Sequence, residues 1–151
     1  MKPEYDAVVV GAGVAGCMAA TTLGIHAKGS KILLVDRNPR TEPGKKTTQG
    51  WICGDAVGEH HAKFVYEKLG IAFGAPEIEN RVDAVVVCSP DRGVSHPFEG
   101  SGFLLNRPKF AHRLLNEAVK TGIEYRDLTH AVGLLTEDNF VIGIVCEIRY
   151  R

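Results

Sequence analysis

The sequence predicts an α/β fold that opens with a strand, a helix and a second, parallel strand. Residues 5–10 end in three valines, and residues 7–10 contain no polar side chain, which is typical of a short parallel strand buried on both faces. Residues 31–35 predict a second strand of the same kind. Between them, small and apolar residues recur at three- and four-residue spacing and predict a helix, with Gly29 as its left-handed cap: Ala15, Met18, Ala19, Thr22 and Leu23.

A glycine fingerprint lies between the first strand and the helix. Gly11, Gly13 and Gly16 form the pattern GxGxxG, and Asp36 ends the second strand 20 residues beyond Gly16. Gly11 permits the tight turn, Gly13 lets the backbone approach a pyrophosphate, and Gly16 allows close packing of the helix on the strand. The helix N-terminus offers free N–H groups to the phosphates, and Asp36 is expected to bind ribose hydroxyls. The pattern predicts a Rossmann-type dinucleotide site, with Ala15 also among its contacts; the alternative is a glycine turn without a ligand.

The fingerprint by itself does not separate FAD from NAD, because both present an adenosine diphosphate group to the same fold. The motif lies at the amino terminus, and a long loop and inserted elements follow the second strand. This arrangement is similar to that of glutathione-reductase-like flavoproteins, and it favours FAD. Arg37 is a further candidate contact; as a ligand for the 2′-phosphate of NADP it is disfavoured, because Asp36 occupies the ribose position.

The remaining elements are less regular. Residues 37–52 predict a long loop rich in Pro, Gly, Lys and Thr. Asp55 is expected to cap a helix that ends before Gly70. The other expected elements are a strand at 82–87, a turn at 89–93 leading to a second short strand, a helix from Pro108 that stops at Gly122, an extended segment at 123–128, and two strands at 132–135 and 141–148. The helix from Pro108 has a predicted apolar stripe: Ala111, Leu114, Leu115, Ala118 and Val119.

Composition excludes several classes of protein. Eighteen Lys and Arg balance eighteen Asp and Glu without long blocks of either sign, which argues against nucleic-acid binding. The four cysteines have no CxxC or Cys/His spacing, so neither a disulfide framework nor a metal site is predicted. Residues 7–25 lack charge, but their glycines argue against a signal peptide or a membrane span. A cytoplasmic location is expected.

The chain length of 151 residues suits one domain. The last predicted strand is followed by no further element that would close the sheet. We therefore expect residues 1–151 to be the amino-terminal part of a single FAD-binding domain, with the second flavin motif and the substrate-binding portion absent.

A five-residue segment carries a more specific resemblance. Residues 53–57, Cys-Gly-Asp-Ala-Val, resemble the Cys-Gly-Asp-Ala signature of archaeal geranylgeranyl reductases. Later stretches stand in the order that this family shows: Leu69-Gly70, Ser89-Pro90-Asp91, Gly102-Phe103-Leu104-Leu105-Asn106 and Asp127-Leu128-Thr129. Residues 54–58 also resemble the Gly-Asp motif of flavin hydroxylases, but that motif belongs beyond residue 151.

The resemblance implies that reduced FAD delivers hydrogen to isolated C=C bonds of prenyl chains, giving the saturated lipids of archaeal membranes. Such a reaction needs a proton donor, and the resemblance places Cys53 near the flavin, where its thiol could supply the proton. The alternative for Cys53 is a small buried hydrophobe. The resemblance also implies FAD contacts from Cys53, Gly54, Asp55 and Ala56, and Arg107 resembles an arginine that related flavin hydroxylases place near FAD.

The implied partners are a prenyl lipid, an electron donor that the sequence does not identify, and the membrane surface through peripheral contact. Two other functions stay open at this point. One is a flavin-dependent monooxygenase or halogenase of the same superfamily, in which the flavin activates oxygen. The other is a nucleotide-binding remnant without catalysis, for which weak FAD binding and no turnover are expected from these 151 residues alone.

Overall fold

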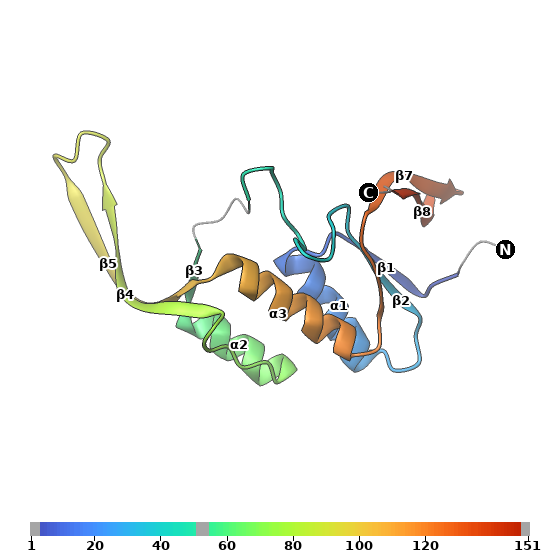
Figure 1. Cartoon of the computed structure of the whole chain (residues 1–151), viewed down its shortest axis with the longest axis horizontal. Coiled ribbons are helices and arrows are strands. Elements are labelled where there is room, and N and C mark those ends of the chain that lie inside the picture. Colours follow the sequence, from blue (N-terminus) through green and yellow to red (C-terminus); the bar gives the residue numbers. More distant parts are fainter. Residues whose placement is uncertain (1–3, 51–54, 149–151) are drawn as a thin grey trace. The chain divides into compact units, whose positions relative to one another are not determined.

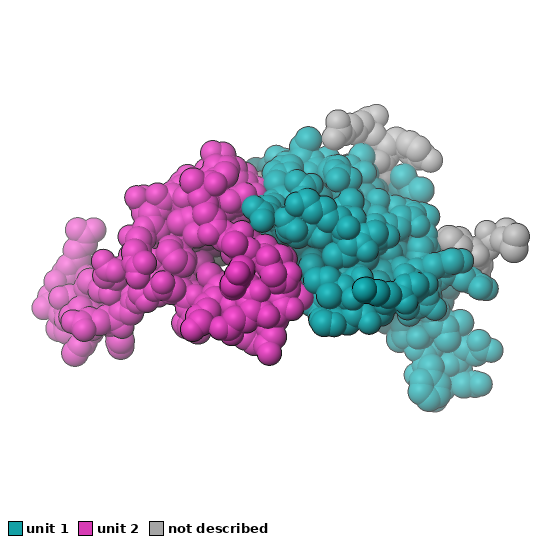
Figure 2. Space-filling view, turned by 90° about the horizontal axis from the view of Figure 1, so that it is seen from below, with its two compact units in different colours: residues 1–52, 111–151 teal, residues 53–110 magenta. Residues whose placement is uncertain are grey.

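The computed structural model describes residues 4–50 and 55–148, which form two compact units. Unit 1 comprises residues 1–52 and 111–151, and unit 2 comprises residues 53–110 (Figure 2). Helices and strands are both present, and a parallel sheet lies in unit 1. The predicted α/β class is confirmed.

The parallel sheet of unit 1 contains the predicted strand–helix–strand unit (Figure 1). β1 (Ala7–Val10) is followed by α1 (Val14–His26) and β2 (Ile32–Val35). β2 pairs in parallel with β1 on one side and with β6 (Glu124–Arg126) on the other, so the strand order is β1-β2-β6. Because both pairings are parallel, the carboxyl ends of all three strands lie at one edge of the sheet.

Burial differs between the two predicted parallel strands. All four residues of β2 are buried, as expected for a central strand. β1 is only half-buried, and Val10 is 55% exposed, so the prediction of a strand buried on both faces was wrong for β1. The physical reason is its position, because β1 pairs with β2 alone among the described strands.

Helix α3 (Arg107–Lys120) begins in unit 2 and continues into unit 1. Its predicted apolar stripe is buried in unit 1 at Ala111, Leu114, Leu115 and Ala118. The helix stops before Gly122, which has a φ of 92°. For α1, the cap is Ala27 and the prediction of Gly29 as the cap was wrong. Gly29 does have a left-handed φ of 89°, but it lies in the turn after the cap.

A hairpin completes unit 1. β7 (Thr129–Glu137) pairs antiparallel with β8 (Phe140–Ile148), which agrees with the two strands predicted there. The two residues between them, Asp138 and Asn139, have φ values of 48° and 66°. Positive φ at both positions is the requirement of a type I′ hairpin turn, and Asp and Asn tolerate it.

Unit 2 is built on an antiparallel sheet of order β3-β5-β4. Its elements are β3 (Ala56–Gly58), α2 (Glu59–Leu69), β4 (Ile78–Cys88) and β5 (Ser95–Leu105). β4 and β5 have 11 residues each and extend well beyond the predicted strand at 82–87. The hydrophobic pattern underestimates their length, because most residues of β4 and β5 are exposed on both faces and the ends of the strands contain many polar residues.

The predicted helix cap at Asp55 was wrong. α2 begins at Glu59 after Gly58, and Asp55 precedes the short strand β3. Residues 56–58 pair with residues 102–104 of β5, a partner far away in the sequence, and this pairing replaces the extra helical turn. The other end of the helix was predicted correctly, since Gly70 is a left-handed cap with a φ of 70°.

Within residues 4–50 and 55–148, no helix is both long enough and apolar enough to cross a membrane. The uncharged run at residues 7–25 is divided between β1, a glycine turn and α1.

Replacing Leu115 by Ala tests the core of unit 1. Leu115 is completely buried, so we expect Leu115→Ala to lower the free energy of unfolding by about 2–5 kcal/mol. Leu134→Ala is the matched control, because Leu134 is 63% exposed and the change should cost less than about 0.5 kcal/mol. Urea denaturation followed by circular dichroism measures both, and equal losses would contradict the burial of α3.

Candidate dinucleotide site

The glycine elbow, residues Gly11–Gly16, joins β1 to α1 at the carboxyl edge of the parallel sheet. Gly11 has a φ of 96°, and its N–H donates to the carbonyl of Val35 at 2.7 Å. A Cβ on Gly16 would lie 1.8 Å from the carbonyl oxygen of Gly11. Only glycine fits there, because α1 starts in direct contact with the preceding turn.

The N-terminus of α1 is uncovered on the side where a phosphate group could approach. The N-cap is Gly13, which has no side chain to occupy the end of the helix, and the first turn contains no acidic residue. A Cβ on Gly13 would meet no described atom within 4 Å, and Ala15 in the first turn is exposed. Unpaired N–H groups at the positive end of a helix make this position suitable for a phosphate.

Asp36 lies at the end of β2, beside the elbow, and is 3% exposed. Its Oδ2 accepts the backbone N–H of Ala12 at 2.5 Å and that of Gly44 at 3.3 Å, and its Oδ1 accepts that of Asn38 at 2.7 Å. A carboxylate has roughly four acceptor positions, and these bonds occupy three. The remaining capacity is on Oδ1, and this is the atom that could accept a ribose hydroxyl.

Two ionisable groups, the thiol of Cys17 and the phenol hydroxyl of Tyr125, are buried near this carboxylate. The Cys17 thiol donates to the carbonyl of Ala12 at 3.3 Å, and burial, with a smaller contribution from the charge of Asp36, raises the pKa of Cys17 to about 12. Burial, followed by the charges of Asp36 and Asp127, also raises the pKa of Tyr125. The Tyr125 hydroxyl is buried and has no hydrogen-bond partner among the described residues. Both groups therefore stay protonated at neutral pH.

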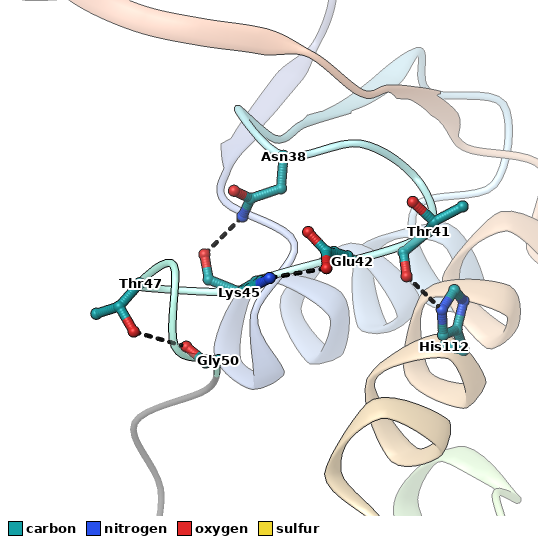
Figure 3. A network of polar contacts seen from close by, with 7 residues as sticks. All are labelled: Asn38, Thr41, Glu42, Lys45, Thr47, Gly50 and His112. Atoms are coloured by element: carbon teal, nitrogen blue, oxygen red, sulfur yellow. Dashed lines mark hydrogen bonds and ion pairs between the residues drawn. The ribbon is translucent and has the colours of Figure 1, made fainter.

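The predicted loop after β2 is held in place by polar contacts (Figure 3). Asn38 Nδ2 donates to the carbonyl of Lys45 at 2.7 Å, and Lys45 Nζ forms an ion pair with Glu42 at 2.7 Å. On the other side, His112 Nε2 lies 2.8 Å from the carbonyl oxygen of Thr41. The loop is thus an ordered segment of unit 1 fixed to α3.

Arg37 is exposed, and its guanidinium donates to the carbonyl of Lys46 at 3.2 Å. It therefore lies along the same loop, next to Asp36 in sequence.

Among the described residues, unit 2 contains three of the predicted contact residues, Asp55, Ala56 and Arg107. Asp55 has a left-handed φ of 54°, and its carbonyl accepts the N–H of Leu105 at 2.7 Å. Its Oδ1 is buried, as is Nε of Arg107, and neither atom has a hydrogen-bond partner in the described parts of the chain. Ala56 is exposed in β3. Buried polar atoms without a partner are rare, and they often indicate a missing ligand or water.

Cys53 and Gly54 lie outside the described residues. Their predicted roles, including that of Cys53 as proton donor, stay predictions.

Comparison with known families agrees with this geometry. Residues 6–69, which contain the elbow and Asp36, match the model of the FAD binding domain family. The chain is also 38% identical over 143 residues to the digeranylgeranylglycerophospholipid reductase of Sulfolobus acidocaldarius. This match covers 94% of the chain and 29% of the relative. The enzyme of the same name from Methanocella arvoryzae is 33% identical over 153 residues, with coverages of 95% and 35%.

The chain is a relative of the archaeal geranylgeranyl reductases. The predicted resemblance is confirmed, and so is the prediction of FAD as the cofactor of this fold. The chain spans about a third of the length of the reductases that it matches.

Solved structures share the fold of this chain. A geranylgeranyl bacteriochlorophyll reductase-like protein from Thermoplasma acidophilum superposes with a TM-score of 0.75 at 23% identity, covering 94% of this chain and 34% of that protein. A flavin-dependent brominase superposes with a TM-score of 0.72 at 19% identity, with coverages of 97% and 34%. The fold is therefore shared by proteins whose names indicate different chemistry.

Sequence reasoning missed part of the neighbourhood of Asp36. Gly44 and Asn38 both donate backbone N–H groups to its carboxylate, and Tyr125 buries a hydroxyl close by. The Pro43-Gly44 pair is a turn signal, but the contact between this turn and the elbow depends on the path of the whole loop.

The buried thiol of Cys17 provides a test of the region below the elbow. Because its pKa is raised to about 12 from 9.0, we expect iodoacetamide at pH 8.5 to label the exposed Cys88 and Cys146 while sparing Cys17. By linkage, this thiol's contribution to stability is fully present below about pH 9 and is lost as the pH rises toward 12. Peptide mass spectrometry gives the labelling, and labelling of all three after denaturation is the control. Equal rates for Cys17 and Cys88 in the native chain would contradict its burial.

Proposed function

We propose that the protein is an FAD-dependent oxidoreductase that reduces the C=C bonds of geranylgeranyl or similar prenyl chains in membrane lipid biosynthesis. The observation that carries this proposal is the 38% identity to a digeranylgeranylglycerophospholipid reductase over 94% of the chain. The glycine elbow and Asp36 support it, because they combine an open helix N-terminus with a buried carboxylate at the end of the second strand.

In this proposal unit 1 binds the adenosine diphosphate part of FAD. The N–H groups at the start of α1, from Gly13 to Gly16, bind the pyrophosphate, and Gly11 provides the turn that presents them. Oδ1 of Asp36 accepts a ribose hydroxyl, while its other contacts hold the elbow in place. Arg37 lies beside the nucleotide end of this site.

In unit 2, Asp55 and Arg107 each bury a polar atom without a partner among the described residues. A polar ligand would relieve the cost of these unpaired atoms, which is about 1–3 kcal/mol for each buried group. The proposal assigns both residues to FAD binding, together with Cys53, Gly54 and Ala56.

FAD, when bound and already reduced by the electron donor, would supply a hydride equivalent to one carbon of the alkene. The other carbon must receive a proton, and the proposal assigns this step to the Cys53 thiol. A thiol of ordinary pKa, about 8.5, is largely protonated at neutral pH and can therefore act as an acid. The partners in this scheme are a prenyl lipid, an electron donor that reduces FAD, and the membrane surface from which the lipid is taken.

The first test is FAD binding by the 151-residue chain, measured by quenching of flavin fluorescence. We expect Gly13→Ala to weaken FAD binding by about tenfold or more, because a methyl group would occupy the space that the pyrophosphate approaches. Stability should fall by no more than about 1 kcal/mol, since Ala is only a poorer N-cap than Gly. Gly100→Ala is the matched control, because a Cβ there also meets no described atom within 4 Å. No FAD uptake by a folded protein of the relatives' full length would overturn the proposal.

The second test is Cys53→Ala in a protein of the relatives' full length, reduced anaerobically and mixed with a geranylgeranyl lipid. A proton donor at residue 53 predicts that flavin is retained and that reoxidation by the lipid slows by roughly 100-fold or more. Cys88→Ala, at an exposed position, is the control and should react normally. Unchanged reoxidation in Cys53→Ala would exclude the proton-donor role. If the unsubstituted protein, assayed separately in air, consumes oxygen in step with substrate, a monooxygenase is favoured instead. Flavin binding without turnover would favour a non-catalytic protein.

A further inference from the structure

Gly44, in the loop after β2, contacts the glycine elbow through its backbone. It has a left-handed φ of 66°, and a Cβ placed on it would lie 2.6 Å from Cα of Gly13, 2.7 Å from the carbonyl oxygen of Ala12 and 2.8 Å from the nitrogen of Gly13. All three neighbours are backbone atoms, which cannot turn aside as a flexible side chain would. A side chain at residue 44 would therefore displace either the loop or the elbow.

A hydrogen bond strengthens this contact. The N–H of Gly44 donates to Oδ2 of Asp36 at 3.3 Å, and the same oxygen accepts the N–H of Ala12. One buried carboxylate oxygen thus joins the loop to the residue that precedes Gly13. The position of Gly13 depends on this oxygen and on the backbone of Gly44.

Further contacts hold the loop around Gly44. The Asn38 side chain bonds the carbonyl of Lys45 at 2.7 Å, and the N–H of Arg40 donates to Oδ2 of Asp127 at 2.8 Å. With the contact between Thr41 and His112, the loop is fixed on both sides of its Pro-Gly turn (Figure 3). Gly44 is therefore held against the elbow by a network that lies wholly in unit 1.

We infer that Gly44 is a positioning residue of the dinucleotide site, which sets the place of the Gly13 backbone by direct contact and through Asp36. This inference rests on the proposed binding of FAD at the elbow. Gly44 itself need not touch the cofactor, because its effect passes through the N–H groups of the elbow. The loop is accordingly part of the dinucleotide site and more than a connection between β2 and unit 2.

The test compares Gly44→Ala with Gly29→Ala in the 151-residue chain. Both glycines have a positive φ, 66° and 89°, so both substitutions introduce backbone strain, but a Cβ on Gly29 meets no described atom within 4 Å. We expect Gly44→Ala to weaken FAD binding by roughly tenfold or more and Gly29→Ala to leave the affinity within about twofold. Amide hydrogen exchange without FAD should become faster at Ala12 and Gly13 in Gly44→Ala alone.

A second variant keeps the inference testable if Gly44→Ala does not fold. Asn38→Ala removes the side-chain bond to Lys45 but keeps the backbone N–H that Asp36 accepts. It introduces no clash, and the loosened loop should weaken FAD binding by about three- to tenfold with a small change in melting temperature.

The outcomes separate the two proposals. If the unsubstituted chain binds FAD and both Gly44→Ala and Asn38→Ala bind it equally well, the positioning role is overturned and the proposed function stands. If affinity falls only in proportion to stability and exchange at Gly13 is unchanged, the role is merely structural and the inference fails. If a folded protein of the relatives' full length binds no FAD, the proposed function fails and the inference fails with it.

Discussion

The hydrogen bonds of one buried carboxylate hold the candidate site together. Asp36 accepts three backbone N–H groups from two segments: that of Ala12 in the elbow, and those of Asn38 and Gly44 in the loop after β2. An ionised carboxylate that is 3% exposed must have such donors, since burying it without them would cost several kcal/mol. The need to satisfy this charge therefore determines where the elbow and the loop lie.

This arrangement gives Asp36 two tasks. A carboxylate at the end of the second strand of a Rossmann-type fold is expected to bind a ribose, and Oδ1 retains the capacity to do so. Its other bonds organise the backbone that would receive the pyrophosphate. The same group thus links nucleotide recognition to the shape of the phosphate site. The side chains of Cys17 and Tyr125 stay protonated at neutral pH, so both are uncharged and place no second negative charge beside Asp36.

Local patterns succeeded where the structure is local. The strand–helix–strand unit, the stripe of α3 and the glycine stops at Gly70 and Gly122 follow from residue spacing and backbone preference, and all are present. The cap assigned to Asp55 failed because residues 56–58 pair with β5, about 45 positions further along the chain. Strands β4 and β5 were underestimated because much of their length is exposed and polar. No local rule describes a partner so distant in sequence.

The sequence by itself determined the fold class, the glycine elbow, the carboxylate at the end of β2 and the kinship with geranylgeranyl reductases, because these depend on spacing and on residue type at single positions. Only the tertiary structure decided which groups that carboxylate binds, which buried atoms of Asp55 and Arg107 lack a partner, and that Gly44 contacts Gly13. The contacts of Asp36 and Gly44 depend on the path of a loop without periodicity. Its course is determined by hydrogen bonds to residues as distant as His112 and Asp127, and such bonds leave no pattern in the sequence.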